Sequence, residues 1–186
     1  MFRDRSLVPA EAVRLLALGA LMERDRRYDD LATEIRFFTQ RIVGPSLDLL
    51  GSSLELLRIE GLAEQVAGTG KDGDQVLRIT DHGRSVFKDL MASQLRAPVN
   101  DVGRFVVLLK LRFLEHLSDD DKDDQLDLIG DVIQTERARA QDLLKEYGDG
   151  PMSAWLKMEV DNLNARYTWV QHMLGDGLPG SDGAQD

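Results

Sequence analysis

Apolar residues recur at helical spacing in three stretches near the start of the chain. Residues 11–23 are apolar around most of the helix circumference, which predicts a central, buried helix. A second helix has one apolar stripe, made of Leu31, Ile35, Phe38 and Ile42. A third begins at Pro45 or Ser46, and its buried stripe consists of Leu47, Leu50, Leu54 and Leu57. Gly61 is expected to end this helix, because glycine readily adopts the left-handed backbone that often follows one.

A short hairpin is predicted after the third helix. Residues 62–66 and 76–79 have the composition of two strands, and a loop rich in glycine and aspartate joins them. Thr80 is expected to cap a further helix that runs to about Leu95. Helix, strand, loop, strand, helix is the order of a winged helix-turn-helix. The third helix would then read DNA, and the hairpin would form the wing.

The second half of the chain is predicted to be helical throughout. One apolar stripe runs from Val102 to Leu117, and a long helix follows from a capping run at residues 118–121 to Tyr147. The last helix carries a seam with alternating steps of four and three: Leu156, Val160, Leu163, Tyr167, Val170 and Leu174. Such a seam is typical of a helix that packs lengthwise on another helix.

These patterns predict a mainly α fold with a small β-hairpin wing. Residues 1–96 form a winged helix-turn-helix domain, residues 97–175 an antiparallel helical dimerisation domain, and residues 176–186 a disordered tail. A homodimer is expected, because three helices alone do not easily bury the apolar faces of the second half, and a second copy would.

Composition limits the classes of function. The chain has 186 residues and a net charge of −10, with no cysteine for disulfides, thiolate metal sites or a thiol nucleophile. It contains no run of eighteen apolar residues and no signal-peptide pattern, so a cytoplasmic protein without membrane contact is expected. Residues 1–95 hold 13 basic and 15 acidic side chains. This near-neutral balance counts against nucleic-acid binding, for which phosphate neutralisation supplies much of the affinity.

The chain resembles PadR-type winged-helix transcriptional regulators from residue 7 to about residue 174. The resemblance rests on positions in the third helix and after the wing: Leu50, Leu54, Leu57, Gly61, Leu62, Leu77, Ile79, Thr80, Gly83 and Arg84. It also includes the stretch Phe105–Leu114, which is similar to the start of the family's dimerisation domain. The resemblance implies a regulator of the repressor type that binds operator DNA as a homodimer and responds to an effector.

The candidate DNA contacts come from four elements. They are Ser46, Ser52 and Ser53 on the third helix, Arg36 and Arg41 on the second, Lys71 at the wing tip and Arg78 on the second wing strand. Serine and arginine side chains can contact phosphates or base edges, and a hairpin tip can reach a groove. Further arginines at the first turn, Arg24, Arg26 and Arg27, are interleaved with acidic residues.

An alternative from another class is a winged-helix module that binds a protein partner and has weakened or lost DNA binding. The resembled family usually has tyrosine and proline where this chain has Gly51 and Ser52, and polar or basic residues where it has Glu55 and Leu56. The surface charge over the third helix and wing would separate the two functions, since DNA requires a basic strip.

Other chemistry finds little support. Trp155 and Trp169 are fourteen residues apart and are candidates for binding a small aromatic effector, or for packing. Seven aspartates lie within residues 119–131, but they lack the glycine and glutamate of a calcium loop. No catalytic residues, metal site or cofactor are predicted, and the chain is not expected to be an enzyme.

Overall fold

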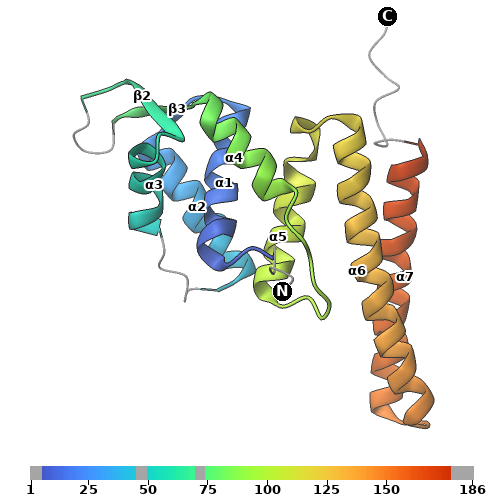
Figure 1. The fold of residues 1–186 in the computed structure, drawn as a ribbon. Coiled ribbons are helices and arrows are strands. Elements are labelled where there is room, and N and C mark those ends of the chain that lie inside the picture. The colour runs from blue at the N-terminus through green and yellow to red at the C-terminus, as the bar shows by residue number, and fades with distance from the viewer. Residues whose placement is uncertain (1–5, 45–49, 70–73, 177–186) are drawn as a thin grey trace, which may run out of the picture. The chain divides into compact units, whose positions relative to one another are not determined.

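The structure is a computed structural model that describes residues 6–44, 50–69 and 74–176 (Figure 1). Its elements are α1 (Pro9–Glu23), β1 (Arg26–Arg27), α2 (Tyr28–Ile42), α3 (Leu50–Ile59), β2 (Ala63–Ala67), β3 (Val76–Ile79), α4 (Asp81–Met91), α5 (Asp101–Arg112), the 3-10 turn η1 (Leu114–His116), α6 (Asp119–Glu146) and α7 (Pro151–Asp176). The chain divides into two compact units. Unit 1 is residues 1–94 with 100–117, and unit 2 is residues 95–99 with 118–186.

Helix α1 forms the centre of unit 1. From Ala12 to Leu21 every residue except Arg14 is buried, as expected for a helix that is apolar on most faces. Helices α2, α3, α4 and α5 all pack against it (Figure 1). The predicted buried first helix is therefore confirmed.

A three-stranded antiparallel sheet with the order β1-β3-β2 completes unit 1. The predicted hairpin of β2 and β3 is present, with Ala63 opposite Ile79 and a register shift between Gln65 and Ala67. Strand β1 was not predicted, because its two arginines carry no alternating pattern. It forms where Arg26 pairs with Leu77 along the free edge of β3.

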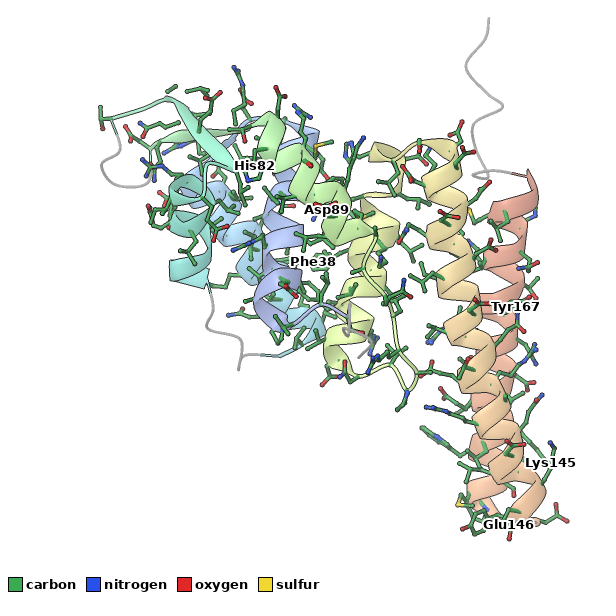
Figure 2. The ribbon with its side chains drawn as sticks, viewed as in Figure 1. Phe38, His82, Asp89, Lys145, Glu146 and Tyr167 are labelled. Carbon is green, nitrogen blue, oxygen red and sulfur yellow. The ribbon has the colours of Figure 1, made fainter. Side chains whose placement is uncertain are left out.

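Helix α5 belongs to unit 1, where it packs on α1 and α2. The rings of Phe38 and Phe105 lie 5.8 Å apart, and Phe38 extends from α2 (Figure 2). Phe113 fills space that a side chain at Gly19 would occupy, since a Cβ there would lie 2.3 Å from its ring. The compact units thus divide the chain differently from the predicted functional domains, which placed α5 with the dimerisation helices.

Two helices end earlier than their sequence patterns suggested. Helix α4 ends at Met91 instead of near Leu95, and Gln94 then pairs with Ser6 in an isolated bridge. Helix α5 ends at Arg112, and the following 3-10 turn carries the apolar stripe on to Leu117. In both places apolar residues remain at least partly buried beyond the last α-helical hydrogen bond. The apolar stripe therefore predicts a longer helix than the structure contains.

Lys110 is an unusual member of the core of unit 1. Its side chain is fully buried, and its ammonium group donates a hydrogen bond to the carbonyl of Met91 at the end of α4. A cation there complements the negative end of the helix. Burial nevertheless disfavours the charged form and lowers the pKa of Lys110 to about 8.

Unit 2 is an antiparallel hairpin of α6 and α7 (Figure 1). The buried apolar residues of the unit are Leu126, Ile129, Val132, Ala140, Val160, Leu163, Val170 and Met173. In the seam between the two helices, a Cβ on Gly130 of α6 would lie 3.6 Å from Val170 Cγ1 of α7. Gln134 Nε2 donates to the Tyr167 hydroxyl at 2.7 Å, beside this seam (Figure 2). Residues 95–99 are held on α6 by a 2.8 Å hydrogen bond from the Val99 N–H to a Glu136 carboxylate oxygen. In the described ranges, no helix is long and apolar enough to cross a membrane.

Candidate nucleic-acid interface

The end of α3 is fixed by its backbone. Leu54 and Leu57 are buried, as the predicted stripe requires. Gly61 has a φ of +70°, and its N–H donates to the Arg58 carbonyl at 3.0 Å. The Leu62 N–H donates to the Leu57 carbonyl at 2.8 Å. This pair of bonds is the glycine-dependent helix ending expected from the sequence, and it turns the chain from α3 directly into β2.

Thr80 joins the end of α3 to the start of α4. Its hydroxyl donates to the Gly61 carbonyl at 2.7 Å and accepts from the Gly83 N–H at 3.0 Å. A Cβ on Gly83 would lie 2.1 Å from the Leu62 carbonyl oxygen, so this close packing requires glycine. The sequence motif containing Thr80 and Gly83 therefore positions α3 and the wing, and gives no evidence of its own for contact with DNA.

The base of the wing is held by short-range hydrogen bonds. The Asp74 carboxylate accepts from the backbone N–H of Thr69 at 3.0 Å and from its hydroxyl at 2.9 Å. Across the sheet, the Tyr28 N–H donates to the Gln75 carbonyl at 2.9 Å. The start of α2 is therefore attached to the start of β3.

Four predicted DNA contacts cannot be placed at the level of side chains. Ser46 and Lys71 lie outside the described residues. Ser52 and Ser53 lie in the first turns of α3, but their side chains are outside the described part of the chain. Their contacts with DNA stay predictions.

The three predicted arginines have different surroundings. Arg78 binds Asp25 through two nitrogens, with Nη2 2.6 Å from Oδ2, and this hydrogen bond lowers the pKa of Asp25 and raises that of Arg78. The Arg41 guanidinium lies 3.4 Å from the centre of the Phe37 ring. Arg36 is exposed and has no ion pair within the described residues. Arg36 is therefore the one of the three whose guanidinium is not already engaged there.

The outer face of α3 carries apolar and charged side chains. Its exposed residues in the last two turns are Glu55, Leu56, Arg58, Ile59 and the adjoining Glu60. Leu56 is 40% exposed and Ile59 is 77% exposed. Sequence reasoning expected Glu55 and Arg58 here but missed Ile59, although its position off the buried leucine stripe was a usable signal.

Both carboxylates on this face have arginine partners. Glu55 pairs with Arg58 at 3.4 Å, one turn along α3, and Glu60 pairs with Arg14 of α1 at 2.9 Å. The half-buried Tyr28 lies close enough to respond to this charge. Burial raises the pKa of Tyr28, and the carboxylate of Glu55 raises it further. The described part of α3 is therefore close to neutral and does not form a basic strip.

Two arginines and two glutamates form a closed network in unit 1. Arg26 pairs with Glu23 and with Glu34, each at 2.6 Å. Arg112 of α5 pairs with the same two carboxylates, at 3.1 Å and 2.5 Å. Burial lowers the pKa of Arg112, but the hydrogen bond to Glu34 and the two carboxylate charges raise it overall. The network joins α1, β1, α2 and α5, and no local sequence pattern indicated it.

Arg24 and Arg27 complete the arginine run at the first turn. Both are exposed, and within the described residues neither has an ion pair, in contrast to Arg26 between them. Arg24, Arg27 and Arg36 are therefore the arginines of β1, α2 and the turn before them whose guanidinium groups could bind a phosphate.

The tryptophans lie on the outer surface of α7. Trp155 is 64% exposed and Trp169 is 42% exposed. Other large apolar side chains of unit 2 are also exposed, namely Leu143, Tyr147, Met152 and Met158. Two cavities of unit 2, of about 330 and 170 Å³, are lined by residues 95–98 with α6 and α7 and include neither tryptophan. Within the described ranges no group of three acidic or histidine side chains is arranged to hold a metal ion.

The order of elements in unit 1, with a third helix followed by a β-hairpin and a packed fourth helix, is that of a winged-helix protein. Residues 2–174 match the AphA-like transcriptional regulators, and the chain belongs to this family. The predicted resemblance to winged-helix transcriptional regulators is thereby confirmed. The family is one of regulators of transcription. No curated protein matches the sequence.

Similar solved structures include three of Bacillus subtilis PadR, each 15% identical to this chain. The structure with p-coumaric acid has a TM-score of 0.40 and covers 91% of this chain and 97% of that one. The structure of PadR has the same TM-score and covers 91% of this chain and 96% of that one. The structure with operator DNA has a TM-score of 0.38 and covers 87% and 95%.

Proposed function

We propose that the chain is a transcriptional repressor that binds operator DNA as a homodimer through α3 and the wing. The observation that carries this proposal is the winged-helix order of the described elements in a member of a regulator family. The end of α3, the Thr80 junction and the base of the wing are all held by specific hydrogen bonds. Such a regulator acts in the cytoplasm, where bacterial-type operators are accessible.

Contacts to phosphate in this proposal come from the edges of unit 1. Arg24, Arg27 and Arg36 are exposed without ion pairs among the described residues, and Lys71 is predicted from the sequence to lie at the wing tip. Arg78 can bind a phosphate only if its ion pair with Asp25 breaks. With so few cations available, binding should be weak at physiological salt unless two copies engage the DNA together.

The dimer is assigned to the helices of the second half, as the sequence suggested. Support comes from the exposed apolar side chains of α6 and α7, because a two-helix hairpin has too little interior to bury them. A second copy would cover them symmetrically. Light scattering on the full chain should give the mass of a dimer at micromolar concentration, and a monomer would contradict the assignment.

The proposed regulator binds an aromatic effector at Trp155 and Trp169. Exposure of both indoles is compatible with a ligand or with the dimer contact. A ligand there should change tryptophan fluorescence in a titration with aromatic acids. An unchanged signal across such a panel would assign both residues to packing.

The decisive experiment is a binding titration of the full chain on the DNA upstream of its own gene, at two salt concentrations. Lys71→Ala should weaken binding and lower the salt slope by about one, since it removes about one phosphate contact. Lys145→Ala is the matched control, because Lys145 is an exposed lysine near the end of α6 (Figure 2). Equal slopes for both variants would remove Lys71 from the interface.

A protein-binding module remains the second candidate, and a specific observation favours it. The described face of α3 carries Glu55 and Glu60, with Glu64 on β2, and its one arginine is paired with Glu55. Such a face suits a partner protein better than DNA. Absence of DNA binding even at low salt, where phosphate contacts are strongest, would favour this second function.

A further inference from the structure

We propose that Arg112, the last residue of α5, is a positioning residue for the wing. It acts through Glu23 and Glu34 on Arg26 of β1, and through β1 on the second wing strand, β3. The proposal rests on the proposed DNA binding. It adds to that function a residue outside α3 and the wing on which the affinity for DNA depends.

The wing is attached to the rest of unit 1 through the segment that contains β1. Residues 25–28 are joined to residues 75–78 along their whole length by an ion pair, by strand pairing and by a backbone hydrogen bond: Asp25 with Arg78, Arg26 with Leu77, Arg27 with Val76, and Tyr28 with Gln75. Strand β1 itself has only two residues, which is shorter than strands that are stable on their own. Its place beside β3 therefore depends on what holds it from the other side.

Arg26 is the side chain that holds β1 on the helices. Its guanidinium binds a Glu34 oxygen through Nη1 and a Glu23 oxygen through Nη2, each at 2.6 Å. Its Nε also donates to the Ala20 carbonyl of α1 at 3.4 Å. The side chain is 13% exposed, so these bonds are partly shielded from water and from salt. One arginine thus fastens the edge of the wing sheet to α1 and α2.

Arg112 balances the charge on which Arg26 depends. It binds the same two carboxylates, Glu23 at 3.1 Å and Glu34 at 2.5 Å, and its guanidinium lies 4.9 Å from the centre of the Phe113 ring. Without Arg112, two carboxylates share one cation and repel each other at partly buried positions. This repulsion is relieved when one carboxylate turns to water, and Arg26 then loses an anchor. The wing should loosen although none of its own residues has changed.

The first test is amide hydrogen exchange on the full chain without DNA. Arg112→Leu should speed exchange of residues 26–28 and 76–79 about tenfold, the size expected for energetic coupling through such a network. Residues 12–21 of α1 should keep their wild-type protection, because they lie in the core. A role limited to overall stability would instead speed exchange equally throughout unit 1.

Arg104→Leu is the matched control. Arg104 is an exposed arginine of the same helix and has no ion pair within the described ranges, so its replacement removes the same charge and leaves the network intact. Exchange in the wing should stay at the wild-type rate. Arg112→Lys should lie between the wild type and Arg112→Leu, because lysine keeps the charge but lacks the planar fork that bridges two carboxylates.

The second test is the affinity of the same variants for the DNA upstream of the gene. At physiological salt, Arg112→Leu should weaken binding about tenfold. Arg104→Leu should change it about twofold at most, since salt screens an exposed charge. Thermal melting checks that all variants are folded.

The inference is overturned if wing exchange is unchanged in Arg112→Leu, or if all of unit 1 accelerates equally. It is also overturned if the wing loosens and the affinity for DNA does not fall. If the wild type binds no DNA, the proposed function fails, while the exchange rates still decide whether Arg112 holds the wing. The two failures are therefore distinguishable.

Discussion

The two units of this chain bury their largest apolar residues to different extents. In unit 1, α1 is covered on nearly every side, and the aromatic residues Phe87, Phe105 and Phe113 are completely buried. In unit 2, the seam between α6 and α7 is buried, but Trp155 and Trp169 remain largely in water. Unit 1 therefore has its own core, although Phe37 and Ile59 stay exposed at its surface, whereas unit 2 consists of two helices that leave both tryptophans in water.

This difference separates two kinds of stability. A unit that buries its apolar residues internally is stabilised in each chain by itself. A hairpin with an exposed apolar face gains stability when another surface covers that face, so its stability depends on protein concentration. Mutations in the two units should therefore differ both in size and in the measurement that detects them.

The largest effect is expected from Gly83→Ala in unit 1. A Cβ at this position would lie 2.1 Å from the Leu62 carbonyl oxygen, which is backbone and cannot move away cheaply. The free energy of unfolding should fall by about 4 kcal/mol, at the upper end of single substitutions. Chemical denaturation measures it, and a loss below about 1 kcal/mol would show that α4 is not packed closely on the end of α3.

Lys110 tests how well the core of unit 1 excludes water. Its pKa is about 8 in the folded protein and near 10.5 in the unfolded chain, so between these values the unfolded chain holds a proton that the folded protein has lost. The free energy of unfolding should therefore rise with pH across this window, by about 3 kcal/mol from this group. Denaturation of the wild type and of Lys110→Met at pH 8 and pH 10.5 isolates the contribution. Parallel pH dependence in the two proteins would mean that the lysine is solvated.

The tryptophan pair tests the exposed face of unit 2. Replacing both Trp155 and Trp169 by alanine should weaken self-association about 100-fold, as expected when large aromatic anchors leave an interface. Sedimentation over a range of concentrations measures this, and the unfolding of unit 1 should stay unchanged. A dimer of wild-type affinity would place the interface elsewhere.

The smallest effect, with the opposite sign, is expected from Gly130→Ala in unit 2. A Cβ here would lie 3.6 Å from Val170 Cγ1, an ordinary contact, so α6 can accept the methyl group. Alanine favours a helix by about 0.8 kcal/mol relative to glycine, and thermal melting should show a small stabilisation. Together with Gly83→Ala, this variant compares the same substitution in a tightly packed and a loosely packed helix.

Much of the fold was predictable because its signals are local. The leucine stripes, Gly61 and Thr80 each act within a few residues of their own position, and the structure uses them as expected. The network of Arg112 with Glu23 and Glu34 was not predictable, because its members lie up to 89 positions apart. The stripe of α5 gave no sign of its partner, since it looks the same whether it packs on α1 or on a second chain.

The candidate site was less predictable than the fold. Residue type suggested the arginines, but only spatial neighbours reveal that Arg78 is held by Asp25 while Arg27 has no such partner among the described residues. Likewise, Ile59 is exposed because no other element of the described structure packs over it. Whether a side chain is free to bind a ligand depends on its neighbours in the folded protein, and local sequence gives little information about them.

The chain leaves one unit and enters the other three times, after residues 94, 99 and 117. These crossings decide where the sequences of two regulators can be joined to make a chimera. A chimera joined near residue 96 would take α5 from a different parent than the rest of unit 1. Phe105 and Phe113 of the original chain would then be lost from the core they fill. A chimera joined at residues 117 and 118 keeps α5 with its winged helix, but residues 95–99 then come from a different parent than α6, to which the Val99 N–H is hydrogen-bonded.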